Sequence, residues 1–274
     1  VYDNLSQGRH GFFTGITVND ANVKFIRGEI LDTRNLQQAL TGIDLVIHLA
    51  AKVSTPFAHG DPHSFEQVNH WGSAELSYLL EESEVKKVIY VSSAAVYGLS
   101  DSIKSPSSTP HPNTWYGTSK LRAEKMLQRL QGQMDVITLR CANVYGYSPS
   151  IRFDAVINRF VRASHFEGRI QIEGDGQQYR PFVHIDRVSK IIKYCCQENL
   201  SGTFNLVDHN LKIWDVALEL RERYPRLETI FIEQDMKRQS LLIEKSPVFS
   251  SVPTISLAEN ISEFTSHFHF GMRE

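Results

Sequence analysis

The sequence predicts an α/β protein built around a doubly wound parallel sheet, and two observations lead to this fold class. Strand-like apolar runs alternate with helix-like segments through the first half of the chain and beyond it. Residues 44–51 form an almost continuous apolar run that ends in small side chains, which suits a buried parallel strand with a ligand at its carboxyl end. The pattern changes after Gly146, so we expect a second, smaller α/β domain there.

The composition of the 274-residue chain, with 41% hydrophobic and 22% charged residues, is that of a globular protein with a large core. A net charge of −2 gives no indication of nucleic-acid binding, and no apolar run reaches the ~18 residues that a membrane span needs. The three cysteines lack disulfide or zinc spacing, and Pro62 separates His59 from His63 as helical metal ligands. We therefore expect a cytoplasmic protein without a metal site, a membrane segment or a nucleic-acid partner.

The chain opens on residues 1–6, which look like the end of a strand. In a dinucleotide-binding unit, a strand, a glycine-rich turn and a helix precede a second strand that ends in an acidic residue. Asp3 fits that acid and nothing comes before it, so we expect the first βα unit to be missing, through truncation or through loss of the pyrophosphate cradle. A carboxylate at this position would accept the ribose 2′-hydroxyl and repel a 2′-phosphate, which favours NAD over NADP. The alternative is that Asp3 is an exposed aspartate in a loop and does not bind the ribose.

The remaining elements follow from apolar spacing and from turn residues. In the first part of the chain we expect a short strand and loop over 23–32, a helix over 35–40, a buried strand over 44–51, a long helix over 64–82, a strand over 86–93, a helix around 114–124 and a strand over 135–140. In the second part we expect a tight turn at 174–176, a strand over 202–207, and helices over 153–164, 188–196 and 213–224.

Tyr116 and Lys120 lie four residues apart on one predicted helix, so their side chains share a face. A phenol has an ordinary pKa near ~10 and is a poor base at neutral pH, but a nearby ammonium favours the phenolate. Lowering the pKa of Tyr116 by about three units needs roughly 4 kcal/mol of differential stabilisation. Tyr116 would then carry a proton near pH 7, where a general acid or base works best.

A Tyr-x-x-x-Lys pattern alone is common by chance, but a second motif accompanies it here. Residues 92–98 read Ser-Ser-Ala-Ala-Val-Tyr-Gly and follow the apolar run 88–91, about twenty residues before Tyr116. A hydroxyl at the carboxyl end of a strand, facing a Tyr/Lys helix, suits the oxidation of a substrate hydroxyl. We therefore predict Ser93, Tyr116 and Lys120 as the catalytic group.

Together the two motifs resemble those of the extended short-chain dehydrogenase/reductase superfamily, in particular its NAD-dependent nucleotide-sugar epimerase/dehydratase branch of the UDP-glucose 4-epimerase kind. Residues 140–146 are similar to that branch's Arg-x-x-Asn-Val-Tyr-Gly, and residues 174–186 to its Gly-Asp-Gly-x-Gln-x-Arg-x-Phe-Val segment. The resemblance implies a Rossmann-like NAD-binding domain over residues 1–146, to which residues of about 181–208 return. It implies a mainly substrate-binding domain over residues 147–274, NAD as the cofactor and a nucleotide-diphosphate sugar as the substrate.

The resemblance also implies binding roles for individual residues. On the cofactor side, in addition to Tyr116 and Lys120, these are Asp3, Asn4, Glu29, Ile30, Leu49, Ala50, Ala51, Asn69 and Ala142. On the substrate side they are Ser93, Asn143 near the diphosphate, and Arg180, whose guanidinium fork suits two phosphate oxygens. Plainer roles stay open, namely close packing for the alanines, a structural hydrogen bond for Asn69 and a salt bridge to Asp186 for Arg180.

The chemistry that the resemblance implies is transient oxidation at C4 of the sugar. Tyr116 would take the proton of the 4-hydroxyl with help from Ser93, hydride would pass from C4 to NAD, and Lys120 would hold the ribose. Ala94 and Ala95 stand where related 4,6-dehydratases carry Asp and Glu, and the second position is Glu in related decarboxylases and Cys in related 3,5-epimerase/reductases. Because alanine transfers no proton, 4-epimerisation or simple 4-keto reduction remains. We predict an NAD-dependent nucleotide-sugar 4-epimerase, with UDP favoured as the nucleotide.

Two other classes stay open. A hydroxysteroid-type dehydrogenase shares the Ser/Tyr/Lys group but generally lacks an arginine at the position of Arg180. A catalytically inactive cofactor-sensing or scaffold protein is supported only by the missing first βα unit. The family's second phosphate-binding arginine has no clear counterpart, and Lys237-Arg238 is only a candidate. The family also implies a homodimer formed through the Tyr/Lys helix and the long helix before it.

Overall fold

The computed structural model describes residues 1–6, 8, 23–53, 61–233, 235 and 238–268. The chain divides into two compact units. The first unit contains residues 1–96, 112–140 and 194–204, and the second contains residues 97–111, 141–193 and 205–274. A late segment of the chain thus belongs to the unit that the N-terminal residues form.

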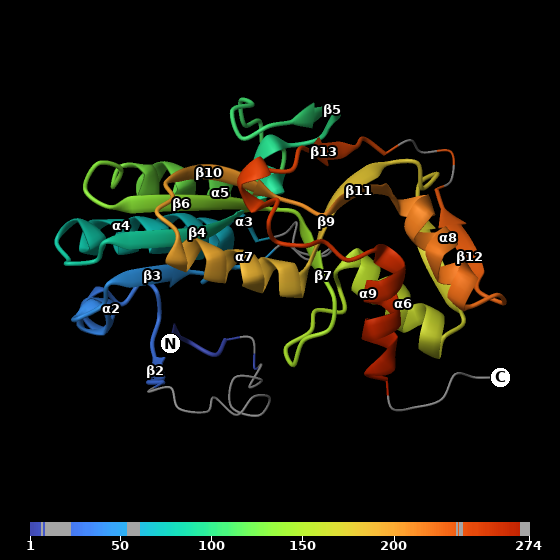
Figure 1. Ribbon diagram of the computed structural model, residues 1–274, viewed down its shortest axis with the longest axis horizontal. Helices are drawn as coiled ribbons and strands as arrows, with labels where there is room; N and C mark the ends of the chain where they lie inside the picture. Colours follow the sequence, from blue (N-terminus) through green and yellow to red (C-terminus); the bar gives the residue numbers. More distant parts are fainter. Residues whose placement is uncertain (7, 9–22, 54–60, 234, 236–237, 269–274) are drawn as a thin grey trace. The chain divides into compact units, whose positions relative to one another are not determined.

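The first unit is built on a sheet with the strand order β10-β6-β4-β3 (Figure 1). Its strands are β3 (Leu45–His48), β4 (Lys87–Ser93), β6 (Asp135–Cys141) and β10 (Gly202–Leu206). β3 runs parallel to β4, with Ile47 opposite Ile89, and β3 forms the edge of this sheet. Parallel neighbours need crossover connections, and the helices between these strands provide them, which confirms the predicted α/β class.

The start of the chain forms a separate pair of strands. β1 (Tyr2–Asp3) and β2 (Ile26–Arg27) pair in parallel, which confirms the strand end expected in residues 1–6 and the short strand expected within 23–32. The helix α2 (Thr33–Leu40) follows, and it begins after Asp32 because that side chain accepts a hydrogen bond from the Asn35 amide.

The long helix expected over residues 64–82 is present, but its hydrogen-bond pattern changes along its length. It consists of α3 (Pro62–Phe65), the π-helical segment η2 (Glu66–Trp71) and α4 (Gly72–Glu81). Next to it lies α5 (Trp115–Gln128), which packs against both η2 and α4 and against β4. The side chains of Leu80, Tyr90 and Leu127 are at most 1% exposed in the core that these elements share. This packing fixes α5 relative to the strand that carries Ser93.

The second unit has its own core, with Phe160, Val216 and Phe264 among its buried residues. A sheet with the order β11-β9-β7 consists of β7 (Asn143–Tyr145), β9 (Tyr179–His184) and β11 (His209–Lys212). Two further pairs are β8 (Arg169–Glu173) with β12 (Glu228–Ile232) and β5 (Ser100–Lys104) with β13 (Leu241–Ile243). The helices in this part of the chain are α6 (Val156–Phe166), α7 (Ile185–Gln197), α8 (Ile213–Arg223) and α9 (Leu257–Ser266).

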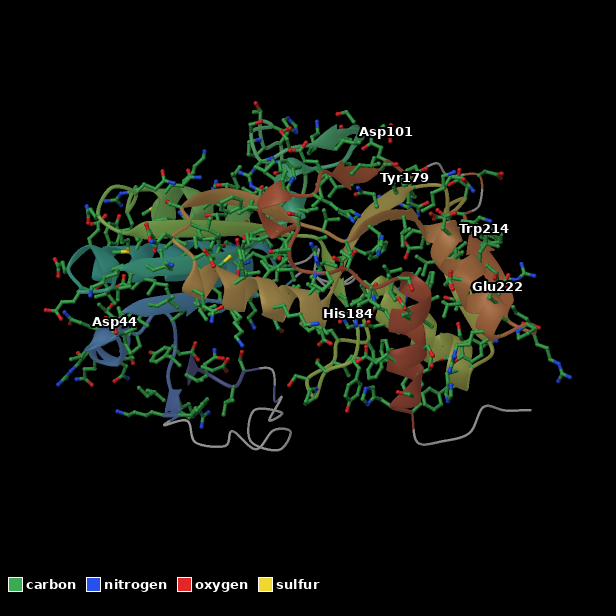
Figure 2. The ribbon with its side chains drawn as sticks, viewed as in Figure 1. Asp44, Asp101, Tyr179, His184, Trp214 and Glu222 are labelled. Carbon is green, nitrogen blue, oxygen red and sulfur yellow. The ribbon has the colours of Figure 1, made fainter. Side chains whose placement is uncertain are left out.

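β9 connects the expected tight turn to the expected helix of the second unit. Tyr179 begins the strand and His184 ends it (Figure 2). β7 pairs with it in parallel and β11 in antiparallel register.

None of the helices in the described ranges is long and apolar enough to cross a bilayer.

Candidate active site

The side chains of Tyr116 and Lys120 are positioned by the way α5 begins. Thr114 caps the helix, and its side chain accepts a hydrogen bond from the Gly117 amide at 3.0 Å. Gly117 also brings the helix close to the turn after β4, because a Cβ at this position would lie 2.5 Å from the carbonyl oxygen of Ala95. Any larger residue would force the helix or the turn to shift. Tyr116 and Lys120 therefore share a helix face near the carboxyl end of β4.

Ser93 is the last residue of β4 and is half-buried. Its Oγ accepts a hydrogen bond from the Ala95 amide at 3.2 Å, at the start of the 3-10 turn η3 (Ala94–Tyr97). Ser92 points to the opposite face of the strand and donates a hydrogen bond to the Glu124 carboxylate at 2.5 Å. Of the two adjacent serines, Ser93 is the one on the less buried face.

Lys120 is only 3% exposed, so its ammonium is almost completely removed from water. Its Nζ donates a hydrogen bond to the carbonyl oxygen of Val91 at 2.7 Å and lies 4.3 Å from the centre of the Tyr90 ring. Tyr116 is half-buried, and its ring meets the Phe65 ring edge to face at a centroid distance of 6.0 Å. The predicted catalytic side chains thus come from β4 and α5 of the same unit.

His48 and Tyr90 are two buried titratable residues near Lys120 that the sequence motifs did not single out. Burial, and secondarily the charge of Lys120, lowers the pKa of His48 to about 3, so this imidazole is neutral at neutral pH. Its Nε2 donates to the Ser73 hydroxyl at 2.8 Å, because that hydroxyl itself donates to the Asn69 carbonyl oxygen. Burial raises the pKa of Tyr90 well above its ordinary value, so its phenol stays protonated.

Glu124 and Arg140 form an ion pair whose side chains are 0% and 5% exposed. Nη2 of Arg140 lies 2.8 Å from one carboxylate oxygen, and its Nε lies within 3.2 Å of both. Together with the hydrogen bond from Ser92, this carboxylate joins α5 to β4 and β6. Sequence reasoning gave neither residue of the pair a role. The sequence contained one indication of a role for Glu124, namely its position one helical turn beyond Lys120 on the same face of the helix.

The first residues expected near the adenosine lie at the ends of β1 and β2. Asp3 ends β1, and its Oδ1 accepts a hydrogen bond from the Leu5 amide at 2.6 Å. The Asn4 side chain donates to the Glu29 carboxylate at 2.8 Å, and that glutamate is exposed. The exposed carboxylate of Asp3 fits the hydroxyl groups of a ribose, which need hydrogen-bond acceptors.

The other residues expected along the dinucleotide lie beyond β3 and beside α4. Leu49 is 59% exposed, Ala50 is exposed and Ala51 is half-buried directly after the strand. Ile30 packs against Gly72, where a Cβ would lie 2.6 Å from the isoleucine Cγ2. Exposed apolar and small side chains at the carboxyl end of a parallel strand fit the flat surface of a dinucleotide.

Asn69 is 1% exposed and its side-chain amide is bonded to the protein. Its Oδ1 accepts from the Lys52 amide at 2.7 Å, and its Nδ2 donates to the Lys52 carbonyl oxygen and to the Ser119 hydroxyl, each at 3.0 Å. Ser119 in turn donates to the carbonyl oxygen of Tyr116 at 2.8 Å. Asn69 therefore joins the segment after β3 to η2 and to the first turns of α5.

Three of the expected site residues lie in the second unit. The amide of Ala142 donates to the Leu206 carbonyl oxygen at 3.0 Å. Asn143 donates through Nδ2 to the Pro181 carbonyl oxygen at 2.9 Å. Arg180 donates through Nη1 to the carbonyl oxygens of Tyr179 and Gln239, each at 2.8 Å.

The charge near Arg180 comes from a second arginine. Burial, and secondarily the charge of Arg238, lowers the pKa of Arg180. Arg238 pairs with Glu233 at 3.1 Å, whereas Lys237 lies outside the described residues. No ion pair joins Arg180 to Asp186, both of which the structure describes. Arg238 also lies 3.9 Å from the Glu173 carboxylate, so two acidic side chains offset its charge. In the described part of the chain, no group of three or more His, Cys, Asp or Glu side chains could hold a metal ion.

Comparison with known proteins gives the family. The chain matches the model of the NAD dependent epimerase/dehydratase family over residues 6–206. Human dTDP-D-glucose 4,6-dehydratase is 34% identical over 205 residues, which cover 73% of this chain and 58% of the human protein. The UDP-glucuronate 4-epimerase of Thermodesulfobacterium geofontis is 30% identical over 252 residues, which cover 88% of this chain and 73% of that protein.

A solved structure supports the same assignment. MoeE5 in complex with UDP-glucose and NAD is similar with a TM-score of 0.79 and 25% sequence identity, and the match covers 92% of this chain and 87% of that chain. The chain spans less than two thirds of the length of the human and bovine dehydratases that it matches, 58% in each case. The family match nevertheless runs from residue 6, just after β1, to the end of β10 and includes Ser93, Tyr116 and Lys120. The chain belongs to the NAD dependent epimerase/dehydratase family.

Proposed function

We propose that this protein is an NAD-dependent nucleotide-sugar 4-epimerase that acts by transient oxidation at C4 of the sugar. The observation that carries the proposal is the arrangement at the end of β4, where Ser93 ends the strand and Lys120 is bound to the Val91 carbonyl oxygen. Tyr116 lies one helical turn before Lys120 on the same face of α5. When bound, NAD supplies the hydride acceptor and, in the return step, the hydride donor.

The three side chains have distinct roles in the proposed reaction. Tyr116 takes the proton of the 4-hydroxyl and later returns it, because the buried ammonium of Lys120 favours the phenolate. Ser93 already accepts a hydrogen bond from the Ala95 amide, so its own O–H donates to the substrate oxygen and orients it. Asp3 is the carboxylate that we assign to the adenosine ribose, whereas Glu29 and Ile30 belong to the segment that we assign to the adenine.

The residues after Ser93 favour epimerisation over dehydration. Ala94 is 3% exposed and Ala95 is half-buried in the turn that follows β4. A 4,6-elimination needs groups that give and take protons at the neighbouring carbon atoms, and alanine has none. This difference carries weight because the human relative at 34% identity is a 4,6-dehydratase.

For the substrate we propose a UDP-sugar. The support comes from the side-chain amide of Asn143 and from the guanidinium of Arg180, whose fork suits the oxygens of a diphosphate. The similar structure of MoeE5 holds UDP-glucose and NAD.

The test is product analysis by NMR after incubation with NAD and, separately, UDP-glucose, UDP-glucuronate and dTDP-glucose. The proposal predicts the 4-epimer of one of these sugars and no 4-keto-6-deoxy product. A 4-keto-6-deoxy product would make the protein a dehydratase. Absence of turnover together with absence of NAD binding would favour the inactive scaffold instead.

We also propose a homodimer and a cytoplasmic location. On the pair of helices that the family uses for dimerisation, Trp71, Tyr78 and Trp115 are 53%, 49% and 60% exposed, which is unusual for side chains of this size. The three cysteines are all free thiols, as a reducing compartment requires. Sedimentation of the purified protein tests the dimer, which a monomer at all concentrations would contradict.

A further inference from the structure

The ammonium of Lys120 has an environment that needs explanation, because an ionised amine this deeply buried is unstable unless polar or polarisable groups surround it. One of its partners is the Val91 carbonyl oxygen at 2.7 Å. Another is the face of the Tyr90 ring, whose centre is 4.3 Å from Nζ. The ring is 1% exposed, so water does not weaken the attraction between the cation and the electron-rich face.

Tyr90 is well placed to hold this position. It lies on β4, three residues before Ser93, and its backbone is fixed by pairing with His48 of β3. Its ring also stacks on the imidazole of His48 at a centroid distance of 5.1 Å, and it belongs to the same core as Leu80 and Leu127. The ring therefore has little freedom to move away from Lys120.

We propose that Tyr90 is a positioning residue of the active site, whose ring face keeps Lys120 charged and thereby sets the pH at which Tyr116 can act as a base. The proposal rests on the proposed roles of Tyr116 and Lys120. It assigns to Tyr90 a part in the reaction that none of the sequence motifs indicates.

Three titratable groups face this region from β3, β4 and α5. On β3, His48 is neutral because burial lowers its pKa to about 3. On α5, the Glu124 carboxylate is held by Arg140 of β6 and by Ser92. Tyr90 itself stays protonated, because burial raises the pKa of its phenol well above the ordinary value, with smaller contributions from Tyr116 and Glu124. Its interaction with the ammonium is therefore that of a neutral aromatic face.

The experiment compares the Tyr90→Leu and Tyr90→Phe variants with the wild-type protein. Removing the ring destabilises the ammonium, so that less positive charge remains near Tyr116 when its phenol ionises. In Tyr90→Leu we expect the rising limb of the pH profile of turnover to move to higher pH by roughly one unit. Tyr90→Phe keeps the ring and is expected to retain the wild-type midpoint. Leu80→Ala, which loses buried volume in the same core, is the matched packing control and should leave the midpoint unchanged.

A second readout separates this proposal from the proposed function. Ultraviolet titration of the Tyr116 phenol, obtained as the difference from Tyr116→Phe, measures the same ionisation without any substrate. If the wild-type protein turns over no nucleotide sugar, the proposed function fails, but the titration still decides the role of Tyr90.

The proposal is overturned if Tyr90→Leu titrates like the wild-type protein, or if Leu80→Ala shifts the midpoint equally. Should Tyr90→Leu fail to fold, pentafluorophenylalanine at this position preserves the shape of the ring but reverses the charge distribution of its face. It should shift the midpoint in the direction expected for leucine. A midpoint equal to that of Tyr90→Phe would exclude the cation–ring interaction.

Discussion

At the scale of single residues, the ion pair of Glu124 with Arg140 stabilises the part of α5 that carries the proposed catalytic side chains. Glu124 lies one turn beyond Lys120 and two turns beyond Tyr116. Its carboxylate is completely buried and accepts hydrogen bonds from β4 and β6. Without the buried Glu124 carboxylate, α5 would lose these hydrogen bonds to the sheet.

We predict that Glu124→Gln lowers the free energy of unfolding by about 3–5 kcal/mol, because it leaves the Arg140 guanidinium buried without a counter-charge. Chemical denaturation followed by circular dichroism measures this. The matched control is Asp44→Asn in the pair with Lys86, whose side chains are 86% and 82% exposed and 3.8 Å apart (Figure 2). Water screens that pair, so its loss should change stability little. Equal effects in the two variants would show that the buried pair has no special weight.

At the scale of the elements, the close approach of α5 to the turn after β4 depends on Gly117. In an ordinary helix interior, replacing glycine by alanine stabilises the protein by roughly 0.5–1 kcal/mol. Here the added methyl group would lie 2.5 Å from the Ala95 carbonyl oxygen and 3.1 Å from Pro112 Cβ. The helix or the turn has to move, and Tyr116 moves with the helix.

Gly117→Ala should therefore destabilise the protein by about 1–3 kcal/mol and lower turnover more than it lowers affinity for the cofactor. Denaturation, initial rates and a cofactor titration give the three quantities. Lys125→Ala, on an exposed position of the same helix, controls for a change in helix propensity. A stabilised Gly117→Ala variant with full activity would contradict the close contact.

The elements also show what a sequence can predict and what it cannot. The helix around 64–82 was predicted from apolar spacing and that around 114–124 from the Tyr116/Lys120 motif, and the structure contains both. The π-helical segment Glu66–Trp71 was not predicted, and within it Asn69 bonds to Lys52 and Ser119 from distant parts of the chain. Local patterns carry no information about such long-range contacts.

The same limit applies to the site. The Ser/Tyr/Lys group could be predicted because two short motifs carry it, each on one element. Tyr90 and His48 could not, because each looks like an ordinary strand residue until the packing shows Lys120 beside it.

At the scale of the whole molecule, the buried neutral His48 makes stability depend on pH. Its pKa is lowered to about 3 in the folded protein, whereas an unfolded histidine has a pKa near ~6.5. The unfolded chain therefore binds the extra proton first as the pH falls. The stabilising contribution of neutral His48 is fully present above about pH 6.5 and is lost as the pH falls from there towards 3.

Within that window the free energy of unfolding should decrease by about 1.4 kcal/mol per pH unit because of this residue alone. Urea denaturation at several pH values measures the slope. His48→Gln should reduce the slope even if it lowers stability at every pH, whereas the same change at His111, which is exposed, should leave it unaltered. An unchanged slope in His48→Gln would mean that other groups determine the acid sensitivity.

A labelled substrate shows whether Ser93, Tyr116 and Lys120 carry out the proposed transient oxidation at C4 of a nucleotide sugar. The enzyme with NAD is given a UDP-sugar that carries deuterium at C4, and the products are followed by NMR, with Tyr116→Phe as the control. We expect a 4-epimer that retains deuterium at C4 and a rate about 10²–10⁴-fold lower in the control. An epimer that has exchanged its deuterium with water, or full activity in Tyr116→Phe, would contradict the proposed oxidation.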